Sequence, residues 1–157
     1  MTSRDIPHYD DIRHRPILTD ADAVSLLEPL LGTAIRRQVW VMFLDESARP
    51  LPLLMPMTVA ARPGAIAVAL GLFMAEIGRA EGASGVVVAF ERRGGAAVRE
   101  TDCAWLRAIR AACVVSGLAF RGPVLCHSRG LSTVPSEQYE TLRPGTDAPP
   151  RQTAPGR

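Results

Sequence analysis

The stretch that decides the fold is Val86-Val87-Val88-Ala89-Phe90, an uninterrupted apolar run made largely of β-branched residues. A run of this kind is typical of a strand that is covered on both faces of a sheet. Glycine-containing segments, residues 82–85 and 91–100, bound it on either side. A doubly covered strand needs helices above and below it, so this stretch predicts an α/β domain.

Further strands are predicted on both sides of this run. Residues 39–44, Val-Trp-Val-Met-Phe-Leu, form a second apolar run and predict another central strand. Residues 51–59 predict an edge strand, because prolines at positions of one parity cannot donate hydrogen bonds along one of its edges. These prolines are Pro50, Pro52 and Pro56. Two short strands, residues 118–126 and 131–134, complete a mixed sheet.

Three helices are expected between these strands. The first starts after Thr19, whose hydroxyl caps it, and should end or kink near Glu28 because Pro29 follows. The second, residues 65–80, is apolar almost all round, as is typical of a helix that is buried or covers a partner. The third, residues 102–116, should be capped by Thr101 and ended by Gly117, with three side chains inward and two outward. The inward residues are Trp105, Ile109 and Cys113, and the outward residues are Arg107 and Arg110.

The order of elements is therefore α-β-β-α-β-α-β-β, which predicts a three-layer α/β/α arrangement with a mixed central sheet. Residues 19–140 should form a single α/β domain. We expect residues 1–18 to be a flexible N-terminal arm, and residues 141–157 to be a disordered tail rich in Pro and Gly.

The charge pattern does not by itself indicate a nucleic-acid binder. All eighteen basic residues are Arg and the chain has no Lys or Asn, as expected for a GC-rich bacterial coding sequence. The net charge is +2 and acids are interspersed with the bases, whereas dedicated binders cluster their basic residues on one face.

Several features predict a reducing cytoplasm as the location. Cys103, Cys113 and Cys126 contain no CxxC pair, so neither a disulfide framework nor a zinc ribbon is expected. The polar, acid-containing N-terminus is unlike a signal peptide, and no apolar run is long enough to span a bilayer. We expect no cofactor, no metal site and no membrane association.

The best candidate site is the loop of residues 91–100, which leaves the carboxyl end of a buried strand and enters a helix N-terminus. Ligands often bind at this position in open α/β sheets. Its arginines and the free helical N–H groups could hold a phosphate or carboxylate, and the alternative is a solvated connecting loop. The candidate ligand-binding residues are Arg92, Arg93, Gly94, Gly95, Arg99 and Asp102.

No intact catalytic motif is present, and we assign no catalytic residue. Asp102 already has a structural role in a first helical turn, where a carboxylate interacts favourably with the helix dipole. Cys126 falls where a core residue would, and His127 begins a turn. An enzyme of unrecognised type that uses Glu91, Asp102 or His127 remains open.

The passage from Val39 to Tyr139 resembles the RadC-like branch of the JAB (MPN) domains. The similar features are the strand ending in Leu44-Asp45, an Ala-rich helix, the apolar strand at 86–89, a helix opened by Asp102 and a closing strand near His127. The resemblance implies an α/β fold with a zinc site at the end of the central strand.

The chain departs from this family where the zinc would bind. Phe90-Glu91-Arg92 stands in place of the His-x-His motif, Arg99 stands near the usual Ser, and no acid in residues 51–59 replaces the upstream Glu. Only Asp102 matches a ligand position, whereas a catalytic zinc needs about three protein ligands. The resemblance therefore implies a non-catalytic scaffold that binds a protein partner or a second copy of itself. The alternative is an anion- or nucleic-acid-binding module that uses the Arg-rich loop, with Arg92, Arg93 and Arg99, together with Arg107 and Arg110.

Overall fold

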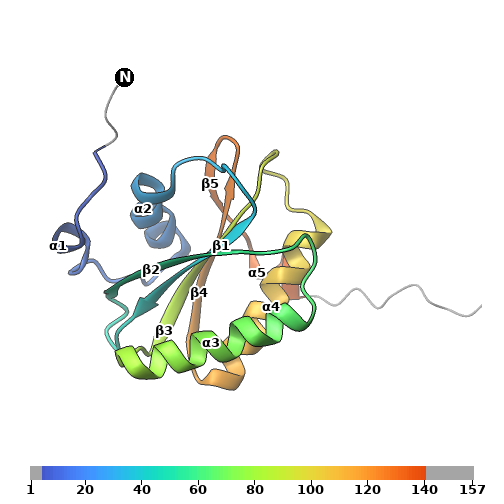
Figure 1. The fold of residues 1–157 in the computed structure, drawn as a ribbon. Coiled ribbons are helices and arrows are strands. Elements are labelled where there is room, and N and C mark those ends of the chain that lie inside the picture. The colour runs from blue at the N-terminus through green and yellow to red at the C-terminus, as the bar shows by residue number, and fades with distance from the viewer. Residues whose placement is uncertain (1–4, 141–157) are drawn as a thin grey trace, which may run out of the picture.

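The computed structural model describes residues 5–140, and Figure 1 shows a five-stranded mixed sheet with helices packed against it. The α/β class predicted from the sequence is confirmed. The expected tail, residues 141–157, lies outside the described residues, as do residues 1–4 of the expected arm.

The strands are arranged in the order β2-β1-β3-β4-β5 across the sheet. Neighbouring strands are antiparallel except for β3 and β4, which are parallel and joined by a helical crossover. The proline-bearing strand β2 lies at the edge, as the spacing of its prolines predicts. The bounds are β1 Gln38–Leu44, β2 Pro50–Thr58, β3 Gly85–Glu91, β4 Ala119–His127 and β5 Gly130–Thr133.

Helices lie on both faces of this sheet. In Figure 1, α2 lies on one side, and α3 and α4 lie next to each other on the other. The short helices α1 and α5 precede α2 and follow β5, respectively. The bounds are α1 Tyr9–Ile12, α2 Asp20–Leu31, α3 Ala65–Glu81, α4 Glu100–Ser116 and α5 Ser136–Glu140.

Two hydrophobic cores follow from the alternation of side chains along the strands. Val86, Val88 and Phe90 of β3 belong to the core beneath α3 and α4. The intervening residues, Val87 and Ala89, belong to the core that α2 covers. Every residue of β3 is buried, as expected for the stretch that decides the fold. The inward positions predicted for α4 are also buried, at Trp105, Ile109 and Cys113.

The predicted end of the first helix near Glu28 is wrong, because α2 continues through Pro29 to Leu31. Pro29 lies in the last turn, where the missing N–H removes only one intrahelical hydrogen bond. The carbonyl of Glu28 still accepts from the N–H of Gly32 at 3.0 Å, so the helix closes after the proline.

The described part of the expected arm packs against the domain. Residues 9–12 form α1, and the side chains of Ile12 and Ile17 are 5% and 1% exposed in the core that α2 covers. The backbone N–H of Ile17 also donates to the carbonyl of Ala48 at 2.8 Å. None of the helices in residues 5–140 has the length and apolar character needed to cross a membrane.

Candidate functional site

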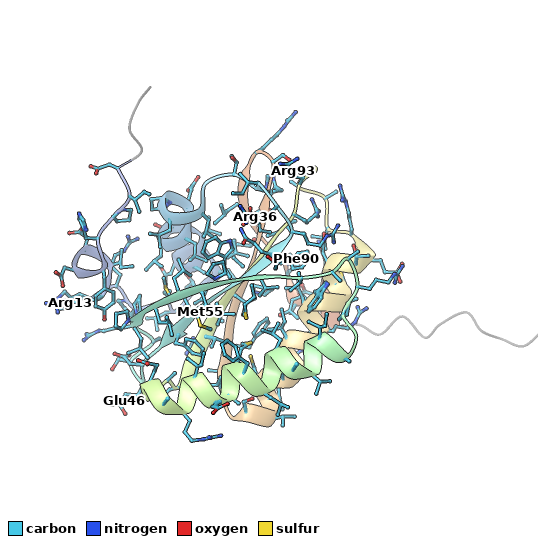
Figure 2. All side chains as sticks on the ribbon, viewed as in Figure 1. Arg13, Arg36, Glu46, Met55, Phe90 and Arg93 are labelled. Carbon is cyan, nitrogen blue, oxygen red and sulfur yellow. The ribbon has the colours of Figure 1, made fainter. Side chains whose placement is uncertain are left out.

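The loop of residues 91–100 connects the end of β3 to the start of α4, as the sequence predicts. Strand pairing fixes its neighbours: Glu91 pairs with Gln38 of β1 on one side and with Cys126 of β4 on the other. The loop therefore lies between the segment that precedes β1 and the turn that follows β4. Figure 2 shows Arg93 of this loop and Arg36 of the segment before β1 at the same end of the sheet.

Arg92, which the sequence presents as a candidate for binding a ligand, is buried at 1% exposure. Its Nη2 lies 2.9 Å from Oδ2 of Asp102, and its Nε donates to both carboxylate oxygens. Its Nη1 and Nη2 also donate to the carbonyls of Gly95 at 2.6 Å and Ala97 at 2.8 Å. Because its hydrogen bonds point inward, the guanidinium holds the loop together and does not face solvent.

Asp102 has two structural partners. Besides pairing with Arg92, its Oδ2 accepts from the backbone N–H of Arg99 at 2.9 Å. This bond makes Arg99 the N-cap residue of α4, so the predicted cap at Thr101 is wrong. The carboxylate at the third helical position accepts from the N–H of the N-cap residue, which is one of the two bonds of a capping box.

Glu91 is a buried acid whose position the sequence reasoning left open. Its Oε1 accepts from the backbone N–H groups of Ile35 at 2.7 Å and Arg36 at 3.3 Å. Its Oε2 accepts from the side chains of Gln38 at 2.5 Å and Trp40 at 2.6 Å. Burial raises the pKa of Glu91, but these four donors together outweigh burial and hold the pKa below its ordinary value. Glu91 therefore anchors the segment before β1.

The remaining candidates of the loop are exposed or only partly covered. Arg93 is exposed and its Nε donates to the carbonyl of Ile35 at 2.8 Å. Gly94 has φ +113°, a backbone conformation that residues with a side chain rarely adopt, so glycine is favoured at this position. Gly95 is exposed, and space is open around its Cα.

The turn after β4 is tied to the same loop. The backbone N–H of Ser128 donates to the carbonyl of Gly94 at 3.0 Å, and the N–H of Gly94 donates to Oγ of Ser128 at 2.9 Å. His127 is buried, and burial, followed by the positive charges of Arg92 and Arg129, lowers its pKa. The structure thus brings three loops together.

The residues at this end do not fit a zinc ion. Of the zinc-ligand positions that the JAB resemblance implies, only Asp102 carries a ligating group. Its carboxylate already forms an ion pair with the guanidinium of Arg92. Within residues 5–140, no group of three or more His, Cys, Asp or Glu side chains is arranged to hold a metal. The guanidinium of Arg92 is hydrogen-bonded to both carboxylate oxygens of Asp102, and a metal ion would need these same oxygens.

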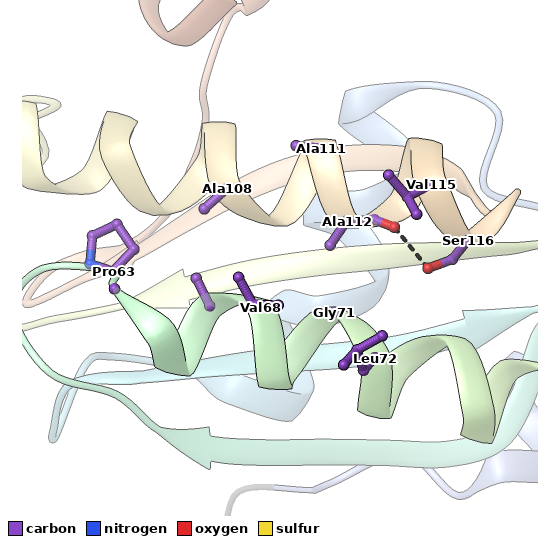
Figure 3. Close-up of a pocket in the computed structure, with 11 residues that line it drawn as sticks. Pro63, Val68, Gly71, Leu72, Ala108, Ala111, Ala112, Val115 and Ser116 are labelled. Carbon is purple, nitrogen blue, oxygen red and sulfur yellow. Dashed lines mark hydrogen bonds between the residues drawn. The ribbon is translucent and has the colours of Figure 1, made fainter.

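A second candidate site is an apolar groove between α3 and α4, with a volume of about 520 Å³. Figure 3 shows the two helices running in the same direction, with Gly71 of α3 facing Ala112 of α4. A Cβ on Gly71 would lie 2.5 Å from the Cβ of Ala112, so the helices approach closely. The lining residues are Pro63, Gly64, Ala67, Val68, Gly71, Leu72, Ala108, Ala111, Ala112, Val115 and Ser116.

The groove has almost no polar side chain to satisfy. Its one hydroxyl, on Ser116, donates to the carbonyl of Ala112 at 2.7 Å (Figure 3). Large apolar side chains of both helices are nevertheless exposed to solvent: Ile66 56%, Val68 66%, Leu72 68%, Phe73 46%, Val114 72% and Val115 87%. The sequence predicts the apolar character of α3 but not the groove, although small residues four apart, at 67 and 71 and at 108 and 112, indicate a close helix contact.

Arg107 and Arg110 of α4, considered above as part of a basic site, face the C-terminal helix. Nη1 of Arg107 donates to the carbonyl of Tyr139 at 3.4 Å, and Nη1 of Arg110 pairs with Oε1 of Glu140 at 2.5 Å.

Comparison with known proteins found no relative: no family model and no curated protein matches this chain.

Proposed function

We propose that this chain is a non-catalytic, JAB/RadC-like scaffold domain that associates with a second copy of itself through the α3–α4 groove. The observation that carries the proposal is the groove, where three large apolar side chains of the two helices, Val68, Leu72 and Val115, line the surface and are exposed. Monomeric proteins rarely leave a contiguous apolar patch larger than a few hundred Å² in water.

We propose that the domain is not catalytic because both acids at this end of the sheet are already bound by hydrogen-bond donors. The carboxylate of Asp102 is bound by Arg92, and the carboxylate of Glu91 is bound by four N–H donors. A general base must reach the proton that it abstracts, and both carboxylates are buried among donors that they already satisfy.

A second copy fits the groove because the surface has complementary parts. Leu72 and Val68 protrude beside a floor of small residues that includes Gly71 and Ala108. In a two-fold interface the same patch contributes both the protruding side chains and the depression that receives them. Residues 65–75 of α3 carry no charge, so two copies can approach without repulsion at this face.

Two other observations bear on the proposal, one on the occupant of the groove and one on the location of the protein. The tail that follows α5, residues 141–157, has Leu142 as its one large apolar residue, which makes it a poor match for an apolar groove. Cys103, Cys113 and Cys126 are buried and form no disulfide within the described residues, which supports the proposed location in a reducing cytoplasm.

The available area predicts a weak dimer. The three exposed side chains that line the groove amount to roughly 200–350 Å² of apolar surface per copy, if each large side chain buries about 60–120 Å². The groove lining adds to this area. Stable complexes bury about 1,200–2,000 Å² in total, so this interface falls below that range and the dimer should dissociate on dilution.

The test is the molar mass in solution at protein concentrations from about 1 µM to about 200 µM, measured by analytical ultracentrifugation. We expect the mass of the wild-type chain to rise from one copy to two over this range. Leu72→Glu/Val115→Glu places charges in the interface and should keep the chain monomeric at every concentration.

The matched control is Ile6→Glu, at a similarly exposed position, 58%, on the side of the molecule that carries α1. This variant should dimerise as the wild type does. A wild-type chain that stays monomeric throughout, or a control variant that dissociates like the double mutant, would contradict the proposal.

A further inference from the structure

Strand register brings four loop positions together at the end of the sheet where β3 and β4 finish. Gln38, Glu91 and Cys126 are paired across β1, β3 and β4. Adjacent strands lie about 4.8 Å apart, so the backbones that continue from these residues leave the sheet within about 10 Å of each other. They lead to Arg36 and Arg37 before β1 and to Arg93 and Arg129 after the other two strands.

Hydrogen bonds fix these three loops to one another. Nε of Arg93 donates to the carbonyl of Ile35, and Glu91 accepts from the N–H groups of Ile35 and Arg36. Gly94 and Ser128 exchange two hydrogen bonds. The arginines therefore project from a braced platform, which lowers the entropic cost of binding a ligand with several of them at once.

The positive charge of this platform is largely uncompensated. Within residues 5–140, the side chains of Arg36, Arg93, Arg99 and Arg129 form no ion pair. Of the two nearby buried acids, Asp102 is neutralised by Arg92, whereas Glu91 keeps its negative charge among four uncharged donors. Glu100, at the start of α4, is the exposed acid of the same loop region.

Arg37, next to Arg36, has one side-chain nitrogen without a hydrogen-bond partner among the described residues. Its side chain is only half-buried, yet this nitrogen, Nη1, is enclosed. Enclosed guanidinium nitrogens almost always donate to an acceptor. Because this nitrogen is enclosed, it is not offered to a ligand, and the exposed arginines are the groups that can contact an anion.

We infer that this end of the sheet binds the phosphate backbone of a nucleic acid without sequence preference. Arg36, Arg93 and Arg129 are exposed on three separate loops, so a polymer with repeated phosphates can contact all of them at once. Ile35 is the large apolar residue exposed here, and the described exposed aromatic residues, Tyr9 and Phe73, lie on α1 and α3. Without an aromatic platform for base stacking, the contacts are to phosphates.

The residues of this surface are not the same as those of the loop site expected from the sequence. Arg92 and Asp102 leave the set, because they are bonded to each other, and Arg36 and Arg129 join it from outside the loop. It does not depend on self-association through the α3–α4 groove, which lies on a helix-covered face of the sheet.

The experiment measures the affinity of the full chain for a short fluorescent DNA duplex by anisotropy, at several NaCl concentrations. Three phosphate contacts predict that log Kobs falls with log salt with a slope of about −3. Arg36→Gln/Arg93→Gln/Arg129→Gln should weaken binding at low salt by about 100-fold or more and bring the slope close to zero.

The matched control is Arg13→Gln/Arg49→Gln/Arg79→Gln, which removes the same charge from exposed positions just after α1, on the β1–β2 turn and on α3. This variant should stay within about threefold of the wild-type affinity and keep the slope. Circular dichroism and thermal unfolding should show that both variants are folded.

Three outcomes would overturn the inference. The wild-type chain could fail to bind the duplex at the lowest salt, or both triple variants could lose affinity equally, which would reveal bulk charge alone. Inorganic pyrophosphate could also displace the duplex at micromolar concentration, which would identify a compact anion as the ligand. A labelled single strand tested in parallel distinguishes single-stranded from duplex backbone.

Discussion

The guanidinium of Arg92 and the carboxylate of Asp102 form an ion pair, 2.9 Å from Nη2 to Oδ2, in which both side chains are 1% exposed. This pair joins the end of β3 to the first turn of α4. The same guanidinium binds the carbonyls of Gly95 and Ala97, so one side chain fixes the course of the whole loop.

Asp102→Asn should destabilise the domain strongly. The amide leaves the charge of Arg92 buried without a counter-ion and weakens the cap on Arg99, at a cost of about 3–5 kcal/mol in the free energy of unfolding. Urea-induced unfolding monitored by circular dichroism measures this cost. Arg92→Met/Asp102→Leu removes both charges and should recover part of the loss. A cost below about 1 kcal/mol for Asp102→Asn would show that the pair is not structural.

Stability should depend on the ionisation of Glu91. Since its pKa in the folded chain lies below the ordinary value of 4.5, the carboxylate stabilises the fold above about pH 4.5, and this contribution is lost as the pH falls through the folded pKa. We expect the free energy of unfolding, measured in denaturant at a series of pH values, to decline with acidification more steeply in the wild type than in Glu91→Gln.

Glu91→Gln should also cost about 1–3 kcal/mol at neutral pH, because the amide nitrogen would face N–H donors. Glu46→Gln, on the exposed β1–β2 turn, controls for the change in net charge (Figure 2). Equal pH profiles for the wild type and Glu91→Gln would exclude Glu91 as the titrating group. His127, whose pKa is also lowered, adds a loss of stability in the same direction as the pH falls below 6.5.

Gly71→Ala should separate α3 from α4. The new methyl group would lie 2.5 Å from the Cβ of Ala112, and overpacking of this kind costs about 1–3 kcal/mol in the free energy of unfolding. Chemical denaturation gives the stability, and the monomer–dimer equilibrium reports any distortion of the groove.

The compensating variant is Gly71→Ala/Ala112→Gly, which moves the methyl group from one helix to the other. It should be more stable than the sum of the two single changes predicts, because the collision is absent. Gly95→Ala, where space is open and φ is not positive, should change stability little. Additive effects at 71 and 112 would show that the two helices do not touch there.

The buried thiols should be nearly unreactive in the native chain. Burial raises the pKa of Cys113 to about 12 and also raises the pKa of Cys103. At pH 8 the thiolate fraction of Cys113 is then about one in ten thousand, and the thiolate is the reactive form. Labelling of Cys103→Ala/Cys126→Ala with a disulfide reagent should be more than about 100-fold slower in buffer than in denaturant. Comparable rates would place Cys113 at the surface.

The sequence predicts the strands well because their apolar runs directly reflect burial. Residues 86–90 and 39–44 lie in buried strands, and the shared parity of the prolines places β2 at the edge. Local capping is less predictable. Thr101 is a suitable cap by composition, but the carboxylate of Asp102 moves the start of α4 to Glu100.

The site could be predicted only in part because its partners are distant in sequence. Loop 91–100 is where pattern places it, yet exposed and buried arginines look alike in a sequence. Arg92 is buried because Asp102 lies opposite it, and Glu91 meets Trp40 and Gln38 only after β1 and β3 pair. The groove requires α3 and α4 to lie side by side, which depends on the parallel pairing of β3 and β4.

The prolines of β2 have a consequence for the chain at high concentration. Pro50, Pro52 and Pro56 have no N–H group and lie on the outermost strand of their side of the sheet. An incoming strand would find carbonyl acceptors there but too few donors to complete a ladder. The proposed association through α3 and α4 would therefore leave this edge of the sheet resistant to growth into fibrils.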